Sequence, residues 1–371
     1  MKLPLLKQAK VSGKTFFLRA DLDVPLSQQT TNNRQQTTIL DDSRLLSWMP
    51  TLEYLLENGA KVVIAGHLGR PEHVNHESRI MNHEFSLRPV AEWLYKKLEV
   101  RSQELEVTKI GEFDGWRLSD NLFLLENLRF YKGEEENDKE FAKKLASLAD
   151  IYVSDAFAAS HRAHASIVGV PKYLPHFAGL SLRKEIEILS KVLEEPDRPL
   201  VVIVGGAKIE TKLPLVEKMH HFADYVLVGG KIAQQTRMLL KVQHEKLKGV
   251  KSALLVADLN EEETDITPKS VENFLQIVAL AKTVVWNGPV GKTQNSKLRT
   301  QNSEKDSGMG TRELAKGIVK SKAYSVVGGG DTIGFLKRIN LLDKFSFVST
   351  GGGAMLEFLS ASMLVGIKAL E

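Results

Sequence analysis

Two histidines and an arginine lie within four consecutive residues of the stretch SDAFAASHRAHAS, which spans residues 154–166. His161 and His164 stand three apart and suggest a metal site, whereas Arg162 between them suggests an anion site. A zinc site would need further histidine or carboxylate ligands, and a guanidinium group among them would repel a divalent cation. We therefore interpret residues 161–164 as part of an anion-binding site.

Further charged side chains follow the apolar runs that predict strands in the first half of the chain. The runs KTFFLRAD, AKVVIAGHLG, DNLFLLENLR and DIYVSDAFA are short and apolar, as buried strands are. The charged and histidine side chains at their ends are Arg19, Asp21, Asp23, His67, Arg70, Arg129, Arg162 and His164. Ligands of open parallel sheets bind beyond the carboxyl ends of the strands, so we expect these side chains to converge, joined by Arg44 from the segment DDSR. One arginine at a strand end is more often a surface ion-pair partner. Their recurrence favours a small, multiply charged anion, because a guanidinium group binds carboxylate or phosphate through two hydrogen bonds.

Glycine takes the place of arginine in the second half of the chain. Expected strands there run into the turns GGAK (205–208), GGK (229–231), NGPVG (287–291), GGGDT (328–332) and GGGA (351–354). Glycine at a strand-to-helix turn lets backbone N–H groups approach a phosphate closely, although tight turns need glycine in any case. The recurrence of these turns, together with Lys208, Lys212 and Asp331, predicts a nucleotide site with bound Mg²⁺.

Composition and missing motifs exclude several classes of protein. No G-x-x-x-x-G-K-[ST] motif occurs, which excludes a P-loop enzyme. Ile333 stands where the dinucleotide fingerprint G-x-G-x-x-G needs its last glycine, which disfavours an NAD-dependent oxidoreductase. The absence of cysteine excludes disulfides, thiolate nucleophiles and cysteine-bound metals. The net charge of +4, without long Lys/Arg runs, fits an anionic ligand and not nucleic acid. With neither a membrane-spanning apolar run nor a signal peptide in the sequence, we expect a cytoplasmic protein that binds no membrane.

Helices on both faces of parallel sheets must position these residues. Apolar runs alternate with amphipathic segments that predict helices at residues 86–98, 138–148, 269–280 and 310–319. The pattern SLRKEIEILSKVLEE predicts a helix over residues 181–195 that links two α/β domains, and a chain of 371 residues is long enough for both. Two polar stretches, residues 27–38 and 293–303, are predicted to be surface loops.

Motifs along nearly the whole chain resemble those of the phosphoglycerate kinase family. They are, in family order, RADLDVPL, DDSR, GHLGRP, LLENLRFYKGEEEND, DAFAASHRAHAS, GGAKIETK, WNGPVG, VGGGDT and STGGGAMLEFL. The resemblance implies two Rossmann-like doubly wound parallel-sheet domains joined by a helix, with a hinged cleft, in a monomeric glycolytic enzyme. The implied parts are a triose-binding domain (1–180), an interdomain helix (181–195), a nucleotide-binding domain (196–358) and a tail (359–371) that packs on the first domain.

The resemblance also implies the site residues. The site for 3-phosphoglycerate or 1,3-bisphosphoglycerate would comprise Asp21, Leu22, Asp23, Arg44, His67, Leu68, Gly69, Arg70, Arg129 and Arg162, with Arg19 and His164 in the surrounding basic patch. The site for MgATP or MgADP would comprise Lys208, Lys212, Glu304, Gly329, Gly330, Asp331 and Thr332. Asp331 would bind the Mg²⁺, while Arg44 and Lys208 would be the catalytic pair that stabilises the moving phosphoryl group.

Some residues differ from the family pattern. Asp23 stands where the family has asparagine, and Lys231 and Thr267 stand where it has glycine near the adenine pocket. The glutamate expected on the nucleotide ribose is Gln294 in an ungapped reading or Glu304 if the polar repeat is an insertion. We expect an active kinase with reduced selectivity for adenine. The alternatives are a catalytically weakened relative that acts as an anion- or nucleotide-binding protein and, more remotely, an NAD-type oxidoreductase.

Overall fold

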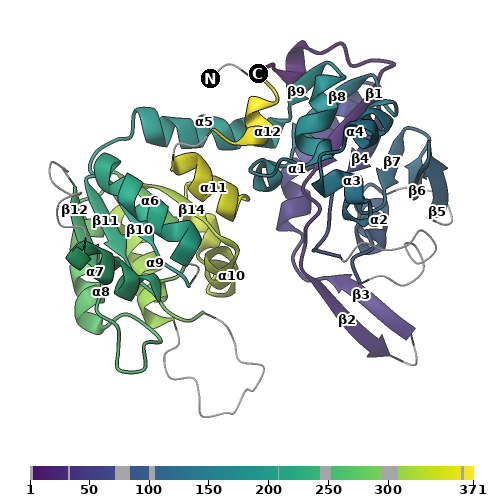
Figure 1. Ribbon diagram of the computed structural model, residues 1–371. Coiled ribbons are helices and arrows are strands. Elements are labelled where there is room, and N and C mark those ends of the chain that lie inside the picture. The colour runs from purple at the N-terminus through teal and green to yellow at the C-terminus, as the bar shows by residue number, and fades with distance from the viewer. Residues whose placement is uncertain are drawn as a thin grey trace. The chain divides into compact units, whose positions relative to one another are not determined.

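The computed structural model describes residues 3–31, 34–71, 84–99, 105–207, 209–242, 252–293, 308–360 and 363–371. The chain divides into two compact units, shown in Figure 1. Unit 1 comprises Met1–Ile186 together with Met363–Glu371, and unit 2 comprises Glu187–Ser362. The predicted fold class, α/β with two parallel-sheet domains, is confirmed. No helix of the described residues is both long and apolar enough to cross a membrane.

Unit 1 is built on a seven-stranded sheet of order β5-β6-β7-β4-β1-β8-β9. Its strands are β1 (Thr15–Ala20), β4 (Lys61–Ala65), β5 (Glu106–Ile110), β6 (Phe113–Ser119), β7 (Leu122–Leu125), β8 (Ile151–Asp155) and β9 (His176–Ala178). The five strands from β7 to β9 run parallel, whereas β5 and β6 form an antiparallel edge. Phe16, Phe17 and Leu18 of β1 are all fully buried. Such continuous burial is typical of a parallel strand covered on both faces.

The helices of unit 1 cover this sheet and form its core. They are α1 (Ser43–Glu57), α2 (Arg88–Lys97), α3 (Lys132–Glu135), α4 (Lys139–Ala146) and α12 (Val365–Lys368), with the short turns η1 (Leu6–Gln8), η3 (Leu128–Phe130), η4 (Phe157–Ala159), η5 (Ala165–Gly169) and η6 (Val170–Lys172). Trp48 of α1 and Leu94 of α2 belong to the main buried cluster. Asp138 caps α4 by accepting a hydrogen bond from the Phe141 N–H at 2.7 Å. The helices predicted at 86–98 and 138–148 are thus present.

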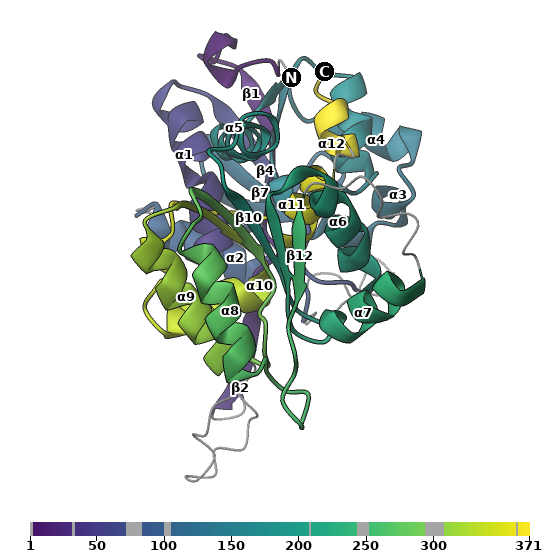
Figure 2. The ribbon, with the colours of Figure 1, turned by 90° about the vertical axis from the view of Figure 1, so that its left-hand side faces the viewer.

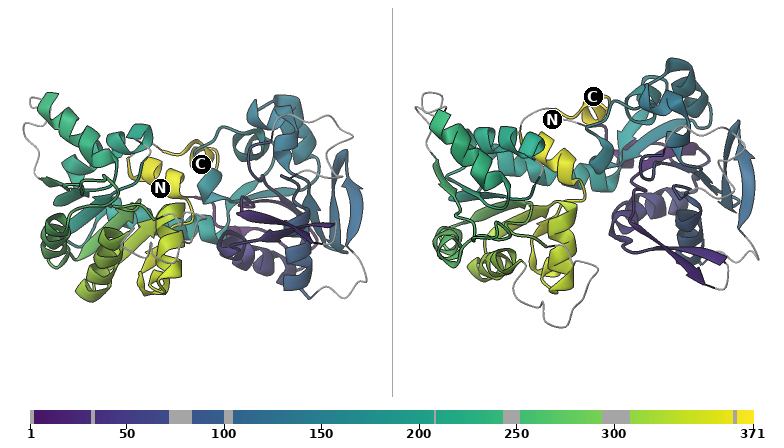
Figure 3. Two further views of the ribbon diagram at one scale, coloured as in Figure 1. Left: turned by 90° about the horizontal axis from the view of Figure 1, so that it is seen from below. Right: turned by 60° about the horizontal axis from the view of Figure 1, so that its bottom comes forward.

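The polar stretch at 27–38 is not a loop, so that prediction is wrong. It contains most of β2 (Leu26–Thr31) and β3 (Arg34–Ile39), which pair antiparallel in a separate two-stranded sheet. Figure 3 shows this hairpin in purple at the edge of unit 1. The stretch is rich in threonine, which favours extended backbone, but it contains no apolar residue, so the alternation that would reveal a strand is absent. The second polar stretch, 293–303, lies almost entirely outside the described residues.

Unit 2 contains a six-stranded sheet of order β12-β11-β10-β13-β14-β15, in which all neighbouring strands run parallel. Its strands are β10 (Leu200–Val204), β11 (Tyr225–Val228), β12 (Ala253–Val256), β13 (Thr283–Asn287), β14 (Tyr324–Gly328) and β15 (Phe347–Val348). This is the doubly wound order. Successive strands are added toward one edge of the sheet from β10 to β12 and toward the other edge from β13 to β15, so the switch point lies between β10 and β13. A ligand of such a sheet binds at the carboxyl ends of these two strands.

The helices of unit 2 lie on both faces of the sheet. They are α6 (Ile209–Phe222), α7 (Ile232–Val242), α8 (Pro268–Val278), α9 (Met309–Ser321), α10 (Gly330–Arg338) and α11 (Gly352–Leu359), with the turn η7 (Leu342–Lys344). Figure 2 shows α8 and α9 side by side on one face and α6 and α7 on the other. The helix α5 (Leu180–Glu194) begins in unit 1 and ends in unit 2, close to the range predicted for the linking helix.

The segment after residue 362 belongs to unit 1. Its helix α12 packs against η5, and the Gly366 N–H donates a hydrogen bond to the Ser160 carbonyl at 2.8 Å. A Cβ atom on Gly366 would lie 2.6 Å from the Ile167 side chain and 3.0 Å from the Ser160 backbone. Only glycine therefore allows α12 to approach this closely.

We expect Gly366→Ala to lower the stability of the protein by about 1–3 kcal/mol, the usual cost of overpacking a close contact. Gly334→Ala, inside α10, is the matched control, because its nearest neighbour would lie 3.8 Å away and alanine favours a helix. Thermal unfolding of both variants measures the difference. Equal melting temperatures for the two would show that α12 adjusts freely.

Candidate functional site

The predicted basic residues of unit 1 meet around Arg19, at the carboxyl end of β1. Arg19 is fully buried, and its Nε donates to the Ser166 hydroxyl at 2.8 Å. Its Nη2 lies 2.9 Å from Nδ1 of His67, the second residue after β4. Because arginine is only a donor, His67 Nδ1 must accept this bond and the ring proton resides on Nε2. His67 is therefore prepared to donate from Nε2 to a ligand.

Two of the histidines near the arginines, His67 and His164, are neutral. Burial, followed by repulsion from Arg19 and Arg129, holds the pKa of His67 well below its usual range. Burial and the same arginines, Arg129 first, lower the pKa of His164 to about 3. Within the described ranges, no group of three or more His, Asp or Glu side chains could hold a metal ion. The positive charge of this site comes from its arginines.

Two further arginines concentrate this charge. Arg129 is buried, donates to the Gly69 carbonyl and has its Nε 3.2 Å from Oε1 of Glu135. Its Nη2 is buried and has no hydrogen-bond partner in the part of the chain that the structure describes. The pKa of Arg129 is lowered by burial and then by Arg162, and that of Arg162 by burial and then by Arg70. An anion with several oxygens would relieve this mutual repulsion and satisfy the unpaired donor.

Arg44 lies in the first turn of α1 and faces two carboxylates. Its Nη1 donates to the Asp23 carbonyl at 3.0 Å and lies 3.7 Å from Oδ1 of Asp21 and 3.6 Å from Oδ2 of Asp23. Oδ1 of Asp23 also accepts the Gly69 N–H at 2.9 Å. An asparagine at position 23 could accept the same N–H bond but could not pair with Arg44. Asp23 therefore adds an ion pair that the family pattern lacks.

The other residues predicted for the triose site differ in accessibility. Leu22 and Leu68 point into the hydrophobic core, and both backbone groups of Leu68 bond to the Asn127 side chain. Gly69 is partly exposed and Arg70 is exposed. Leu22 and Leu68 thus shape the loops, whereas Arg70 is free to turn toward a ligand.

Sequence reasoning missed two buried residues beside this cluster, Glu134 and Ser166. Glu134 accepts hydrogen bonds from both the hydroxyl and the backbone N–H of Ser166. Both residues lie inside motifs that we matched, GEEEND and RAHAS. Nothing in the amino-acid sequence indicated which of the three successive glutamates has a buried side chain.

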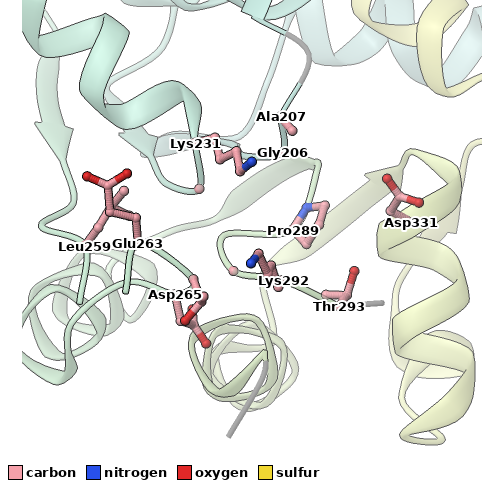
Figure 4. Close-up of a pocket in the computed structure, with 13 residues that line it drawn as sticks. Gly206, Ala207, Lys231, Leu259, Glu263, Asp265, Pro289, Lys292, Thr293 and Asp331 are labelled. Atoms are coloured by element: carbon pink, nitrogen blue, oxygen red, sulfur yellow. The ribbon is translucent and has the colours of Figure 1, made fainter. Parts of the chain in front are cut away.

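Unit 2 has a pocket of about 230 Å³ at the switch point of its sheet. Its wall includes Gly206, Gly230, Lys231, Leu259, Glu263, Asp265, Pro289, Lys292, Thr293 and Asp331. Figure 4 shows Asp331, at the first turn of α10, across the pocket from Leu259 and Glu263. The pocket combines glycine turns, apolar contacts and two lysines, which suits a nucleotide.

The glycine turns after β10 and β13 pack backbone against backbone. A Cβ atom on Gly288 would lie 2.1 Å from the Gly205 carbonyl oxygen. Lys212 is buried, and its Nζ donates to this same carbonyl at 2.5 Å and to Oδ1 of Asn287 at 3.1 Å. Lys212 thus binds the two turns together and is not part of the pocket wall. Lys208 lies outside the described residues, as do Gln294 and Glu304.

The start of α10 offers groups for phosphate and Mg²⁺. Gly329 precedes the helix with a φ of +95°, and the Thr332 hydroxyl accepts the Gly288 N–H at 3.0 Å. Gly330 opens the helix, whose first N–H groups attract anions. The Asp331 carboxylate is exposed at this point. It fits Mg²⁺, which usually binds one or two carboxylates together with substrate phosphates and water.

Lys231 and Thr267, the two residues that stand where the family has glycine, lie in different places relative to this pocket. Lys231 lies in the pocket wall, as predicted. Thr267 does not, so the expectation that it enters this pocket is wrong. Its hydroxyl instead caps α8 by accepting the Ser270 N–H at 3.2 Å. Threonine is a favoured residue at the position before a helix, which explains why it is tolerated there.

Comparisons with known proteins agree over the whole chain. The family model for phosphoglycerate kinase matches residues 6–255 and 241–362. The chain is 35% identical to a phosphoglycerate kinase of Leptospira biflexa serovar Patoc, over 100% of this chain and 98% of that protein. It is 36% identical to that of Dictyoglomus turgidum, over 99% and 98%. The solved phosphoglycerate kinase from Coxiella burnetii is 35% identical, with a TM-score of 0.76 over 100% of this chain and 99% of that one. None of these matches supports a weakened binding protein.

We expect the low pKa of His164 to make the protein less stable in acid. The unfolded chain binds a proton at this histidine near pH 6.5, whereas the folded protein does so only near pH 3. Relative to His164→Gln, the wild type should therefore lose stability as the pH falls below about 6.5, by roughly 2 kcal/mol at pH 5. Urea unfolding of both proteins at pH 5 and pH 8 measures this difference. A difference in unfolding free energy between the two proteins that is the same at pH 5 and pH 8 would contradict this expectation.

Proposed function

The chain belongs to the phosphoglycerate kinase family of phosphotransferases, and on that premise we propose that it transfers a phosphoryl group reversibly between 1,3-bisphosphoglycerate and ADP, giving 3-phosphoglycerate and ATP. The observation that carries this proposal is the cluster of Arg19, Arg129 and Arg162 around a neutral His67, in which the buried Arg129 Nη2 has no partner among the described residues. Several guanidinium groups in one place, one of them with a donor left over among the described residues, suit a ligand with carboxylate and phosphate groups.

Unit 1 would bind the triose through these groups. His67 would donate from Nε2, and Arg129 and Arg162 would bind phosphate or carboxylate oxygens. Arg70 would join from the surface. Asp21 is buried, and its Oδ2, which has no hydrogen-bond partner within the described ranges, would accept a substrate hydroxyl. Gly69 would place its backbone next to Arg129, and Leu22, Asp23 and Leu68 remain proposed substrate-binding residues.

Unit 2 would bind the nucleotide in its pocket. The N–H groups at the start of α10, with Gly329, Gly330 and Thr332, would hold phosphate oxygens, and Lys208, Lys212 and Glu304 remain proposed nucleotide residues. Asp331 would hold Mg²⁺, which neutralises phosphate charge when it is bound.

The reaction needs no covalent enzyme intermediate. The carboxylate oxygen of 3-phosphoglycerate attacks the γ-phosphorus of ATP, and the bond from that phosphorus to the ADP oxygen breaks. The protein aligns the groups and stabilises the charge that spreads over the transferring phosphoryl oxygens. We assign this stabilisation to Arg44 and Lys208. We further propose that the enzyme acts as a monomer in the cytoplasm, on small-molecule substrates of glycolysis, without nucleic acid or membrane.

A coupled assay tests the proposed function. ATP formation from 1,3-bisphosphoglycerate and MgADP should be detected through hexokinase and glucose-6-phosphate dehydrogenase, and omission of either substrate should abolish it. Absence of turnover with both substrates present would refute the proposal.

Arg44→Ala should lower kcat on the order of 10³-fold while changing KM much less, because its charge is needed in the transition state. Arg88→Ala is the matched control, since Arg88 is an exposed arginine of the same unit that pairs only with Glu92 among the described ion pairs. Steady-state kinetics with both substrates varied separate the two parameters. A fall of only a few-fold in kcat would remove Arg44 from the catalytic role.

Lys231 should reduce the selectivity for adenine. An ammonium group donates to the O6 acceptor of guanine, whereas adenine presents an amino donor at that position. We expect kcat/KM for GTP within about tenfold of that for ATP, a gap of about 1.4 kcal/mol, and a stronger ATP preference in Lys231→Gly. Thr267→Gly is the control, because Thr267 caps α8 outside the pocket. A wild-type preference for ATP above about a hundredfold would contradict the role of Lys231.

A further inference from the structure

We propose that Glu134 is a positioning residue for the triose site, which acts through the Ser166 hydroxyl to hold Arg19 and thereby to keep the His67 Nε2–H directed to the substrate. This inference rests on the proposed function for the identity of the ligand. Glu134 itself touches neither substrate nor reacting atoms in this proposal.

The contacts form a continuous chain of buried groups. Glu134 is fully buried in α3, and its Oε1 accepts the Ser166 hydroxyl proton at 2.5 Å while its Oε2 accepts the Ser166 N–H at 2.9 Å. Ser166, also fully buried, accepts the Arg19 Nε–H at 2.8 Å. Arg19 in turn donates to His67 Nδ1 at 2.9 Å. Glu134 and His67 are thus joined by only two intervening side chains.

With Glu134 ionised, the direction of every hydrogen bond in this chain is fixed. Arginine can only donate and an ionised carboxylate can only accept, so the single hydroxyl proton of Ser166 must point to Glu134. The Ser166 lone pairs then face Arg19. Burial raises the pKa of Glu134, and the charge of Arg19 opposes that rise. Because two donors of Ser166 converge on the carboxylate, the ionised form fits these contacts.

Loss of the Glu134 carboxylate would therefore change the hydrogen bonding of His67. Without an oriented Ser166 hydroxyl, the buried Nε–H of Arg19 lacks an acceptor, which is costly for a charged group. The guanidinium group would shift away from His67 and toward its other partner, the Ala20 carbonyl, with which Nη1 bonds at 2.5 Å. His67 Nδ1 would lose its donor, and its ring proton would no longer be confined to Nε2.

Glu134→Gln tests this inference with almost no change in volume. One of the two acceptor oxygens becomes an NH₂ donor, which opposes either the N–H or the hydroxyl of Ser166. We expect KM for 3-phosphoglycerate to rise about tenfold, with KM for ATP unchanged and kcat within about threefold. Histidine ¹⁵N NMR of the full chain should show the ring proton of neutral His67 only on Nε2 in the wild type. In the variant it should show a mixture of the Nδ1–H and Nε2–H tautomers.

A double-mutant cycle separates positioning from folding. Ser166→Ala should raise KM for 3-phosphoglycerate as Glu134→Gln does, and the double variant should be no worse than Ser166→Ala, because the two act in one chain. Asp150→Asn is the matched control, since its Oδ2 accepts the Thr15 N–H at the opposite end of β1. That variant should leave KM for the triose unchanged.

Three results would overturn the inference. They are an unchanged triose KM in folded Glu134→Gln, an unchanged His67 tautomer, or independent multiplication of the two effects on KM. If Glu134→Gln does not fold, Ser166→Ala alone must alter both the triose KM and the tautomer. A wild type without turnover would refute the proposed function instead, and calorimetric titration with 3-phosphoglycerate would then still compare binding to the variants.

Discussion

The arrangement of unit 1 depends on the repulsion between arginines that share one buried site. Arg19 and Arg129 are almost wholly removed from water, and Arg162 lies close enough to lower the pKa of Arg129. Like charges in a region of low dielectric repel strongly, so the fold must supply fixed acceptors to hold them. Carbonyl groups, the Ser166 hydroxyl and the Glu135 carboxylate do this, and Glu134 accepts the hydroxyl proton of Ser166. Nη2 of Arg129 still has no hydrogen-bond partner among the described residues, which leaves a donor for an anionic ligand.

The same constraint determines what the histidines can do. Positive surroundings and burial keep His67 and His164 uncharged, so they act as fixed hydrogen-bond donors or acceptors. In unit 2 the corresponding task falls to backbone N–H groups, which require glycine where two turns touch. Lys212, held among carbonyl oxygens at that contact, supports the turns from behind the pocket.

The sequence predicted the elements whose burial leaves a periodic trace. The helix α9 illustrates this, because the sequence predicted a helix over residues 310–319 and α9 spans Met309–Ser321. The hairpin of β2 and β3 could not be predicted, because its strands carry no apolar alternation. The site was predicted where strand ends coincide with charged residues, as at Arg19 and His67. Partners such as Glu134 were missed, since the direction of a side chain depends on tertiary packing.

Departures from the family pattern show the same limit. Lys231 and Thr267 looked alike as glycine replacements, yet one lies in the pocket wall and the other caps a helix. Whether a side chain that replaces glycine contacts a ligand depends on the direction in which that side chain leaves the backbone. A linear motif does not contain that direction.

Unit 1 is discontinuous in the chain, and this has a consequence for its synthesis. The helix α12 from residues 363–371 packs on η5, the segment that contains Ser166. On a ribosome, all of unit 2 must be translated between the first 186 residues and this last contact, which takes roughly 10 to 35 s at ordinary elongation rates. During that interval η5 already has its contacts with α3, α4 and η6 but lacks its contact with α12. Unit 1, which holds the arginine cluster, would therefore gain this contact only after unit 2 has been translated, although most of unit 1 is encoded first.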